Sequence, residues 1–171
     1  YLLNKNIFFL DKYLILEKLE KFNFLEEIKI QKIFPSEINI NLKKTKFLGS
    51  TIINGEKFFI GNNGKFTDSK QIKIEKNLPL IFGKFKIDEF LELQNILEEK
   101  QIDIKKIVKY YYYRNKRWDF QNQDGLIVML PSKNIKNSLK IYKKMISNVN
   151  LSSIKIVDLR VPSQIILTNE K

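Results

Sequence analysis

The pairs Asn54-Gly55 and Asn63-Gly64 constrain the fold of this chain more than any other feature. Both residues of such a pair tolerate positive φ values, so Asn-Gly between short apolar runs is a strong signal for a tight hairpin turn. The surrounding sequence, STIINGEKFFIGNNGKF, supplies such runs on both sides of each pair. We therefore expect short antiparallel strands to begin near Gly49.

The residues before this region predict a helix followed by a hairpin. Asp11 can cap a helix whose apolar residues, Ile15 and Leu19 among them, fall at helical spacing. Two nearly alternating runs, EIKIQKIF and EININL, then flank a short turn that contains Pro35. Alternating runs around a turn indicate an antiparallel pair of strands. We expect this small α+β unit to end near residue 45.

The remainder predicts a mixed β-sheet with two helices. KIDEFLELQNILEEK is amphipathic with a helical period, and a second helix follows Ser132, which is suited to capping it. Strands are expected at residues 104–113, 117–122 and 126–130, and the closing strands at SIKIVDL and SQIILT. The predicted fold class is therefore α+β.

The stretch KYYYYRNKRWDF mixes aromatic and basic residues, as a nucleic-acid platform would. Its alternation favours a hairpin instead, because Tyr and Trp form strands readily and pair well across them. We expect Trp118 and Phe120 in the core. On the preceding strand, the expected faces are Ile107, Lys109, Tyr111 and Tyr113 on one side and Val108, Tyr110 and Tyr112 on the other.

The net charge of +12 arises from 31 lysines and arginines, of which only Arg114, Arg117 and Arg160 are arginine. Arginine's planar fork is the group that phosphate and base recognition usually exploits, and the lysines are dispersed along the chain. The chain also lacks alanine and is rich in Ile, Lys and Asn, so a bias toward A/T-rich codons accounts for most of the basicity. A basic nucleic-acid-binding module stays as the alternative function.

The composition argues against catalysis. The chain contains no His and no Cys, which removes the commonest general base, thiol nucleophiles and the usual transition-metal ligands. Ser152 and Lys155 match S-x-x-K, but the companion motifs of serine–lysine acyl enzymes are missing. We expect no catalytic residue, no cofactor and no metal.

Five motifs in order carry a family resemblance: NFLEEIKIQKIFPSEININL, FIGNNGKF, LPLIFG, RWDFQNQDGLIVMLP and IVDLRVPSQIIL. On these motifs the chain resembles the FtsQ/DivIB family of bacterial cell-division proteins over essentially its whole length. Two positions depart from the pattern, with Lys43 where the family commonly has a glutamate and Val161 where an aromatic residue can stand.

The resemblance implies that residues 1–45 are the C-terminal part of a POTRA domain and residues 46–171 an FtsQ-type β domain. It also implies a single-pass protein of the bacterial inner membrane, anchored by a transmembrane helix upstream of Tyr1. Its bulk would lie in the periplasm at the division septum. The protein would be a non-enzymatic divisome scaffold that binds FtsB and FtsL, contacts other divisome proteins and helps control septal peptidoglycan synthesis.

In that family, FtsB adds a strand to the edge formed after the Asp-Leu-Arg element. The resemblance therefore implies an edge strand from Val161 to Leu167, and Pro162 near its start fits an edge, where a missing N–H is tolerated. Arg160 would either anchor a partner carboxylate or pair inside the domain. The expected partner-binding residues are Arg160, Val161, Ser163, Gln164, Ile165, Ile166, Leu167, Lys116 and Arg117.

A second alternative is a POTRA-containing protein of outer-membrane assembly or secretion. Such a protein would need tandem POTRA repeats or a barrel. The landmarks of the β domain in this sequence argue against both.

Overall fold

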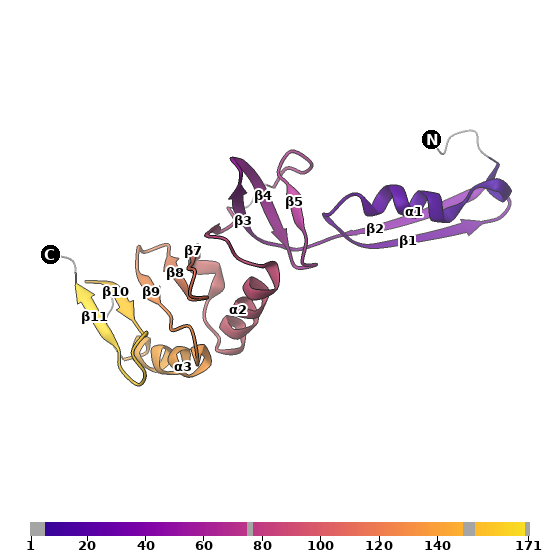
Figure 1. The fold of residues 1–171 in the computed structure, drawn as a ribbon. Helices are drawn as coiled ribbons and strands as arrows, with labels where there is room; N and C mark the ends of the chain where they lie inside the picture. Colours follow the sequence, from indigo (N-terminus) through magenta and orange to yellow (C-terminus); the bar gives the residue numbers. More distant parts are fainter. Residues whose placement is uncertain (1–5, 75–76, 149–152, 170–171) are drawn as a thin grey trace.

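The computed structural model describes residues 6–74, 77–148 and 153–169, and their strands form two separate sheets. A two-stranded sheet with one α-helix lies at one end of an elongated molecule, and a nine-stranded sheet with two α-helices makes up the rest (Figure 1). This arrangement confirms the predicted α+β class. Among the described residues, no helix is both long enough and apolar enough to cross a membrane.

The helix–hairpin unit at the N-terminal end contains η1 (Ile7–Phe9), α1 (Lys12–Glu20), β1 (Leu25–Ile33) and β2 (Glu37–Lys44). The Asp11 carboxylate accepts a hydrogen bond of 2.8 Å from the Tyr13 N–H, which confirms the predicted helix cap. β1 and β2 pair antiparallel with Ile30 opposite Ile40, as the alternating runs predict. Ile15 of α1 is buried, so the helix contributes its apolar side to the unit.

The second unit contains β3 (Phe47–Ile53), β4 (Glu56–Gly61), β5 (Phe66–Asp68), β6 (Leu80–Phe82), α2 (Ile87–Glu99), η2 (Ile104–Lys106), β7 (Ile107–Tyr112), β8 (Trp118–Asn122), β9 (Ile127–Met129), α3 (Ile135–Ile146), β10 (Ile154–Asp158) and β11 (Ile166–Asn169). The strand order is β11-β10-β9-β8-β7-β6-β3-β4-β5.

The two predicted Asn-Gly turns both occur in this unit. Asn54 has a φ of 52° and Gly55 of 83° in the turn between β3 and β4. Gly64, with a φ of 73°, lies in the turn between β4 and β5, so both predicted turns are confirmed.

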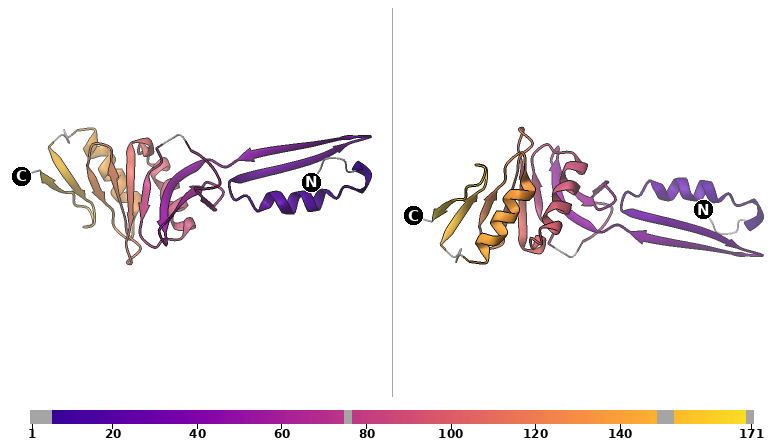
Figure 2. Two further views of the ribbon diagram at one scale, coloured as in Figure 1. Left: turned by 90° about the horizontal axis from the view of Figure 1, so that it is seen from above. Right: turned by 90° about the horizontal axis from the view of Figure 1, so that it is seen from below.

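The core of this sheet lies on one face, beneath the two helices. β6 runs parallel to β7 and β9 parallel to β10, and α2 and α3 provide the two connections. Both views in Figure 2 place these helices on the same side of the sheet. A row of side chains crosses five strands beneath them, each at most 1 % exposed: Ile81, Tyr110, Phe120, Val128 and Val157.

The aromatic stretch forms the predicted hairpin, but Ile107, the first residue of β7, lies on the face opposite to the predicted one. An irregularity in the pairing of β7 with β8 lies between Ile107 and Lys109. Because an extra residue in one strand shifts the alternation, Ile107 is buried together with Tyr110. The Tyr110 hydroxyl accepts a hydrogen bond of 2.8 Å from the buried Gln94 amide. Tyr110, Trp118 and Phe120 therefore pack in the core, where they cannot stack on bases.

Two local predictions need correction. The segment 104–106 is a short 3₁₀ turn capped by the Asp103 side chain, and the strand begins only at Ile107. The N-cap of α3 is Asn134 in the left-handed conformation, with a φ of 59°, and not Ser132. Asn is one of the few residues that adopt this conformation readily, and its side chain makes no capping hydrogen bond here.

Trp118 is 3 % exposed and packs against three aromatic rings of the same core, those of Phe85, Phe90 and Tyr112. Trp118→Ala should lower the free energy of unfolding by about 3–5 kcal/mol, because it removes a large buried side chain and leaves a cavity. Urea denaturation followed by circular dichroism measures the change. Val108→Ala, at an exposed strand position, is the control and should change stability by no more than about 0.5 kcal/mol. Equal stability of Trp118→Ala and the wild type would contradict the core assignment.

Candidate partner-binding edge

β11 forms one edge of the nine-stranded sheet. It pairs antiparallel with β10, and within residues 6–74, 77–148 and 153–169 no strand pairs with its other side. All four of its residues are exposed, including the apolar Ile166 and Leu167. An edge of this kind presents a row of backbone N–H and C=O groups to any strand that approaches it.

The edge strand is shorter than predicted. Pro162 and Ser163 lie in a turn that is closed by a hydrogen bond of 3.2 Å from the Gln164 N–H to the Val161 carbonyl. Ser163 has a φ of 61°, and proline followed by a residue with positive φ is typical of a type II turn. The predicted strand over Val161–Leu167 is therefore wrong for its first five residues. The strand itself begins at Ile166.

Ile165 occupies a different position from its neighbours. It is partly buried and packs against the core of the sheet, whereas Val161, Gln164 and Ile166 are exposed. Its side chain therefore contributes to the packing of the domain. The predicted residues Ile166 and Leu167 lie in the open edge strand itself.

The opposite edge of the sheet is short and partly covered. β5 has three residues, and the Asn23 side chain donates a hydrogen bond of 2.8 Å to the Phe66 carbonyl. The Gly61 N–H bonds to the Lys65 carbonyl, and bonded and non-bonded pairs alternate in an antiparallel ladder. The backbone groups of Phe66 therefore point away from β4, and Asn23 occupies one group of the outer row. β11 is the more accessible of the two edges.

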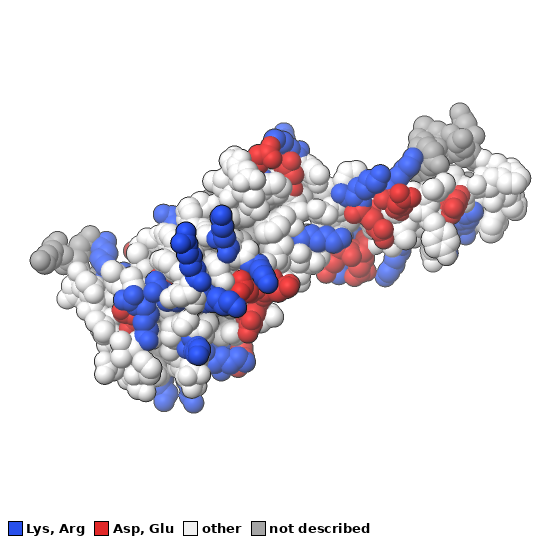
Figure 3. All heavy atoms as spheres, in the orientation of Figure 1, with Lys and Arg blue, Asp and Glu red and all other residues white. Residues whose placement is uncertain are grey.

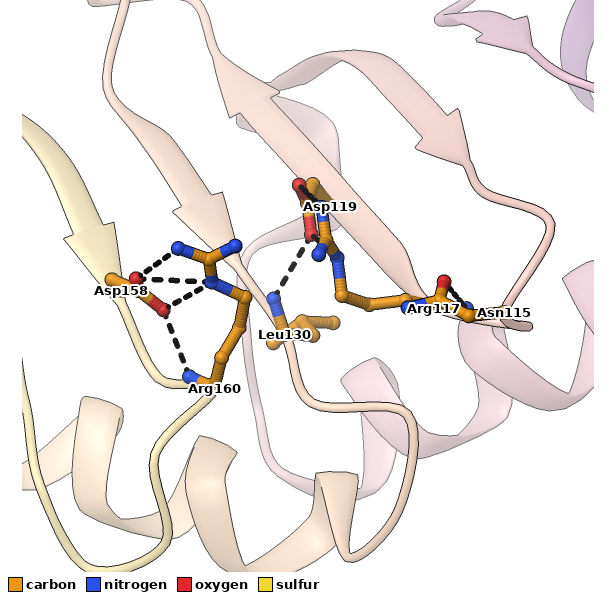
Figure 4. A network of polar contacts seen from close by, with 6 residues as sticks. All are labelled: Asn115, Arg117, Asp119, Leu130, Asp158 and Arg160. Carbon is orange, nitrogen blue, oxygen red and sulfur yellow. Dashed lines mark hydrogen bonds and ion pairs between the residues drawn. The ribbon is translucent and has the colours of Figure 1, made fainter.

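Arg160 forms a chelating ion pair with Asp158 at the end of β10. Its Nε lies 2.9 Å and 3.0 Å from the two carboxylate oxygens, and its Nη2 lies 2.6 Å from Oδ2 (Figure 4). The Arg160 side chain is nevertheless 45 % exposed, and its Nη1 takes part in none of these bonds. The guanidinium lowers the pKa of the Asp158 carboxyl below its ordinary value. Arg160 thus pairs inside the domain, which was one of the two possibilities left open by the sequence.

A second arginine–aspartate pair lies beside the first. Arg117 bonds to both carboxylate oxygens of Asp119, at 3.2 Å and 3.1 Å, and the Leu130 N–H donates to Asp119 Oδ1 at 3.2 Å. Asp119 is 1 % exposed, and this burial raises the pKa of its carboxyl although Arg117 acts in the opposite direction. Asp119 and Asp158 are both aligned with Met129 of β9, so the two pairs lie next to each other on the face without helices (Figure 4).

A cavity of about 520 Å³ opens where these two pairs meet the start of α3. It brings the predicted residues Arg117, Arg160 and Ser163 together. Lys116 does not line it, and instead lies beside Glu89 at a separate cavity of about 270 Å³. Ser132 and Pro162, which the sequence singled out for other reasons, also line the larger cavity, together with residues that the sequence analysis did not name: Asn115, Pro131, Lys133, Asn134, Asn137, Ser138, Ile141 and Leu159.

One sequence signal could have found part of this lining. The run PSKNIKNS, residues 131–138, places small polar and basic side chains directly after a buried strand, and it was interpreted only as a helix start. The lining offers hydrogen-bond donors, cations and apolar surface. No group of three or more potential metal ligands occurs in the described part of the chain.

The two aspartates should respond to acid in opposite directions. Asp158 has a lowered folded pKa, so its ionised form stabilises the fold above about pH 3.8, and this contribution is lost as the pH falls through the folded pKa. Asp119 has a raised folded pKa, so its contribution is present below about pH 3.8 and is lost as the pH rises through the folded pKa.

Urea unfolding from pH ~7 to pH ~2 should therefore show the stability gap between wild type and Asp158→Asn shrinking in acid. Over the same pH range, the free energy of unfolding of the wild type should rise relative to that of Asp119→Asn. Gaps that do not change with pH would show that neither carboxyl differs in pKa between the folded and unfolded states.

The fold and its edge can be compared with known proteins. The family model described as "Cell division protein FtsQ/DivIB, C-terminal" matches residues 52–160, which is more than half of the chain. The chain is also similar to "Cell division protein FtsQ" of Bradyrhizobium diazoefficiens, with 22% identity over 165 residues. This alignment covers 95% of the chain and 48% of the relative, so the chain spans about half the length of the curated relative it matches. The match to the family model shows that the chain belongs to the FtsQ/DivIB family.

Proposed function

We propose that this chain is the periplasmic part of a divisome scaffold that binds the FtsB–FtsL pair by strand addition at β11. Family membership supports a role in cell division. The observation that carries the finer proposal is the edge itself. β11 is paired on one side, and its exposed side chains include Ile166 and Leu167.

Strand addition would use the backbone N–H and C=O groups on the outer side of β11. A strand laid beside it would gain main-chain hydrogen bonds, which supply affinity, while alternate side chains would supply specificity. Ile166 is aligned with Asp158 and Leu167 with Val157, so the two apolar side chains of the edge point to opposite faces of the sheet. A bound strand would meet one apolar residue on each face.

The cavity at the start of β11 is suited to hold the partner residues that flank the added strand. Arg160 and Arg117 are both neutralised by aspartates, so they offer hydrogen-bond donors without an unpaired buried charge. An approaching partner carboxylate would find the Arg160 Nη1 and the exposed Lys133. We assign Arg160, Arg117 and Ser163 to this end of the partner site, and place Lys116 outside it.

The remaining assignments depend on the same family. We propose that residues 1–45 are the C-terminal part of a POTRA domain and residues 46–171 an FtsQ-type β domain. The proposal includes a membrane anchor upstream of this chain, a single-pass inner-membrane location at the septum and a non-enzymatic influence on septal peptidoglycan synthesis. Its support is the family match together with the separation of the strands into two sheets.

Proline substitutions along β11 test strand addition. Proline removes one backbone N–H, and the N–H groups of successive strand residues point to opposite sides. Among Ile166→Pro, Leu167→Pro and Thr168→Pro, the variants that lose an outward N–H should abolish binding of the FtsB–FtsL periplasmic segments while keeping the fold. The others should lower the melting temperature because they disrupt pairing with β10.

The measurement is a pull-down of the two partner segments beside a melting curve for each variant. Alanine at the same three positions is the matched control, since it removes the side chain and keeps the N–H. If every folded proline variant bound the partner like the wild type, strand addition at β11 would be wrong.

A further inference from the structure

Three segments that are distant in the sequence meet where the helix–hairpin unit joins the nine-stranded sheet. They are the turn before β1 (residues 21–24), the two-residue link Thr45-Lys46 and the turn between β4 and β5 (residues 62–65). Figure 1 shows this junction between the β1–β2 hairpin and the strands β3 to β5. The partner edge β11 lies at the other end of the nine-stranded sheet, away from this junction.

Asn63 connects all three segments. Its side-chain amide donates to the Asn23 carbonyl at 2.9 Å and to the Leu25 carbonyl at 3.3 Å. Its backbone N–H donates to the Thr45 hydroxyl at 3.2 Å, and its Oδ1 accepts from the Lys65 N–H at 3.3 Å. Both the nitrogen and the oxygen of the Asn63 side chain therefore form hydrogen bonds. The nitrogen points from the sheet into the helix–hairpin unit.

The surrounding contacts close the junction further. The Asn23 side chain returns a hydrogen bond to the Phe66 carbonyl of β5. Thr45 is buried, and its N–H bonds to the Phe24 carbonyl at 2.9 Å. A side chain at Gly61 would overlap both Asn63 Oδ1 and Thr45, so the packing leaves no room there.

We propose that Asn63, with Asn23, locks the helix–hairpin unit and the nine-stranded sheet into one rigid body. A junction held only by a two-residue link would let the units rotate about the link. Hydrogen bonds among the three segments oppose this rotation, because any rotation must break several of them together. The lock would fix the direction in which β11 is presented relative to the first sheet.

The absence of cysteine allows the lock to be measured directly. Cysteines introduced at the exposed positions Asn41, in β2, and Gln123, after β8, carry one spin label on each unit. Pulsed electron–electron double resonance then gives the distance distribution between the labels. The otherwise unchanged chain should show one narrow peak, and Asn63→Ala should show the loss of this peak in favour of a broad distribution.

Asn62→Ala is the matched control, since Asn62 is exposed and its side chain makes no hydrogen bond among the described residues. It should keep the narrow peak. Asn23→Ala is the second variant, since it removes the bond to β5 without altering the turn that contains Asn63. It also should broaden the distribution.

Circular dichroism on each variant separates a released junction from an unfolded chain. If Asn63→Ala does not fold, Asn23→Ala decides the test. A broad distribution in the labelled chain that keeps Asn23 and Asn63, or a narrow one in folded Asn63→Ala and Asn23→Ala, would overturn the lock.

Discussion

The buried row that crosses five strands beneath α2 and α3 fixes the register of the nine-stranded sheet. Its members, from Ile81 to Val157, are almost completely inaccessible, and a slip by one residue would turn a whole strand's apolar side chains to the opposite face. The other residues of these five strands are placed on one face or the other by this row. The residues that alternate with it, Asp119 and Asp158 among them, must lie on the face without helices.

That placement explains why two aspartates and two arginines gather at one end of the sheet. Asp119 and Asp158 come from strands on either side of β9, and each is chelated by an arginine two residues away in the sequence. The pairing neutralises the charges of these four side chains in a strongly basic protein, whose Lys and Arg side chains are blue on the face shown in Figure 3. The net charge of the whole chain therefore does not indicate the charge of these paired side chains near β11.

Short-range patterns were sufficient to predict much of the fold. The Asn-Gly turns, the Asp11 cap and the hairpin around Pro35 depend on neighbouring residues, and the structure confirms each of them. The burial of Ile107 could not be predicted, since the irregularity depends on the strand that pairs with β7. The start of β11 was missed because Pro162 was assigned to an edge strand and not to a turn. The contacts of Asn63 join residues about forty positions apart, and no local pattern encodes them.

The two edges of the nine-stranded sheet are treated differently by the rest of the chain. At β5, only three residues pair, and a side chain from the helix–hairpin unit bonds to an outward carbonyl. At β11, four exposed residues come after a tight turn, and no described residue covers their outer side. Open edges favour association with other strands, so a fold that covers one edge and leaves the other accessible limits where a strand can be added. The Asn23 contact, which is also part of the proposed lock, thus leaves β11 as the more accessible edge of the sheet.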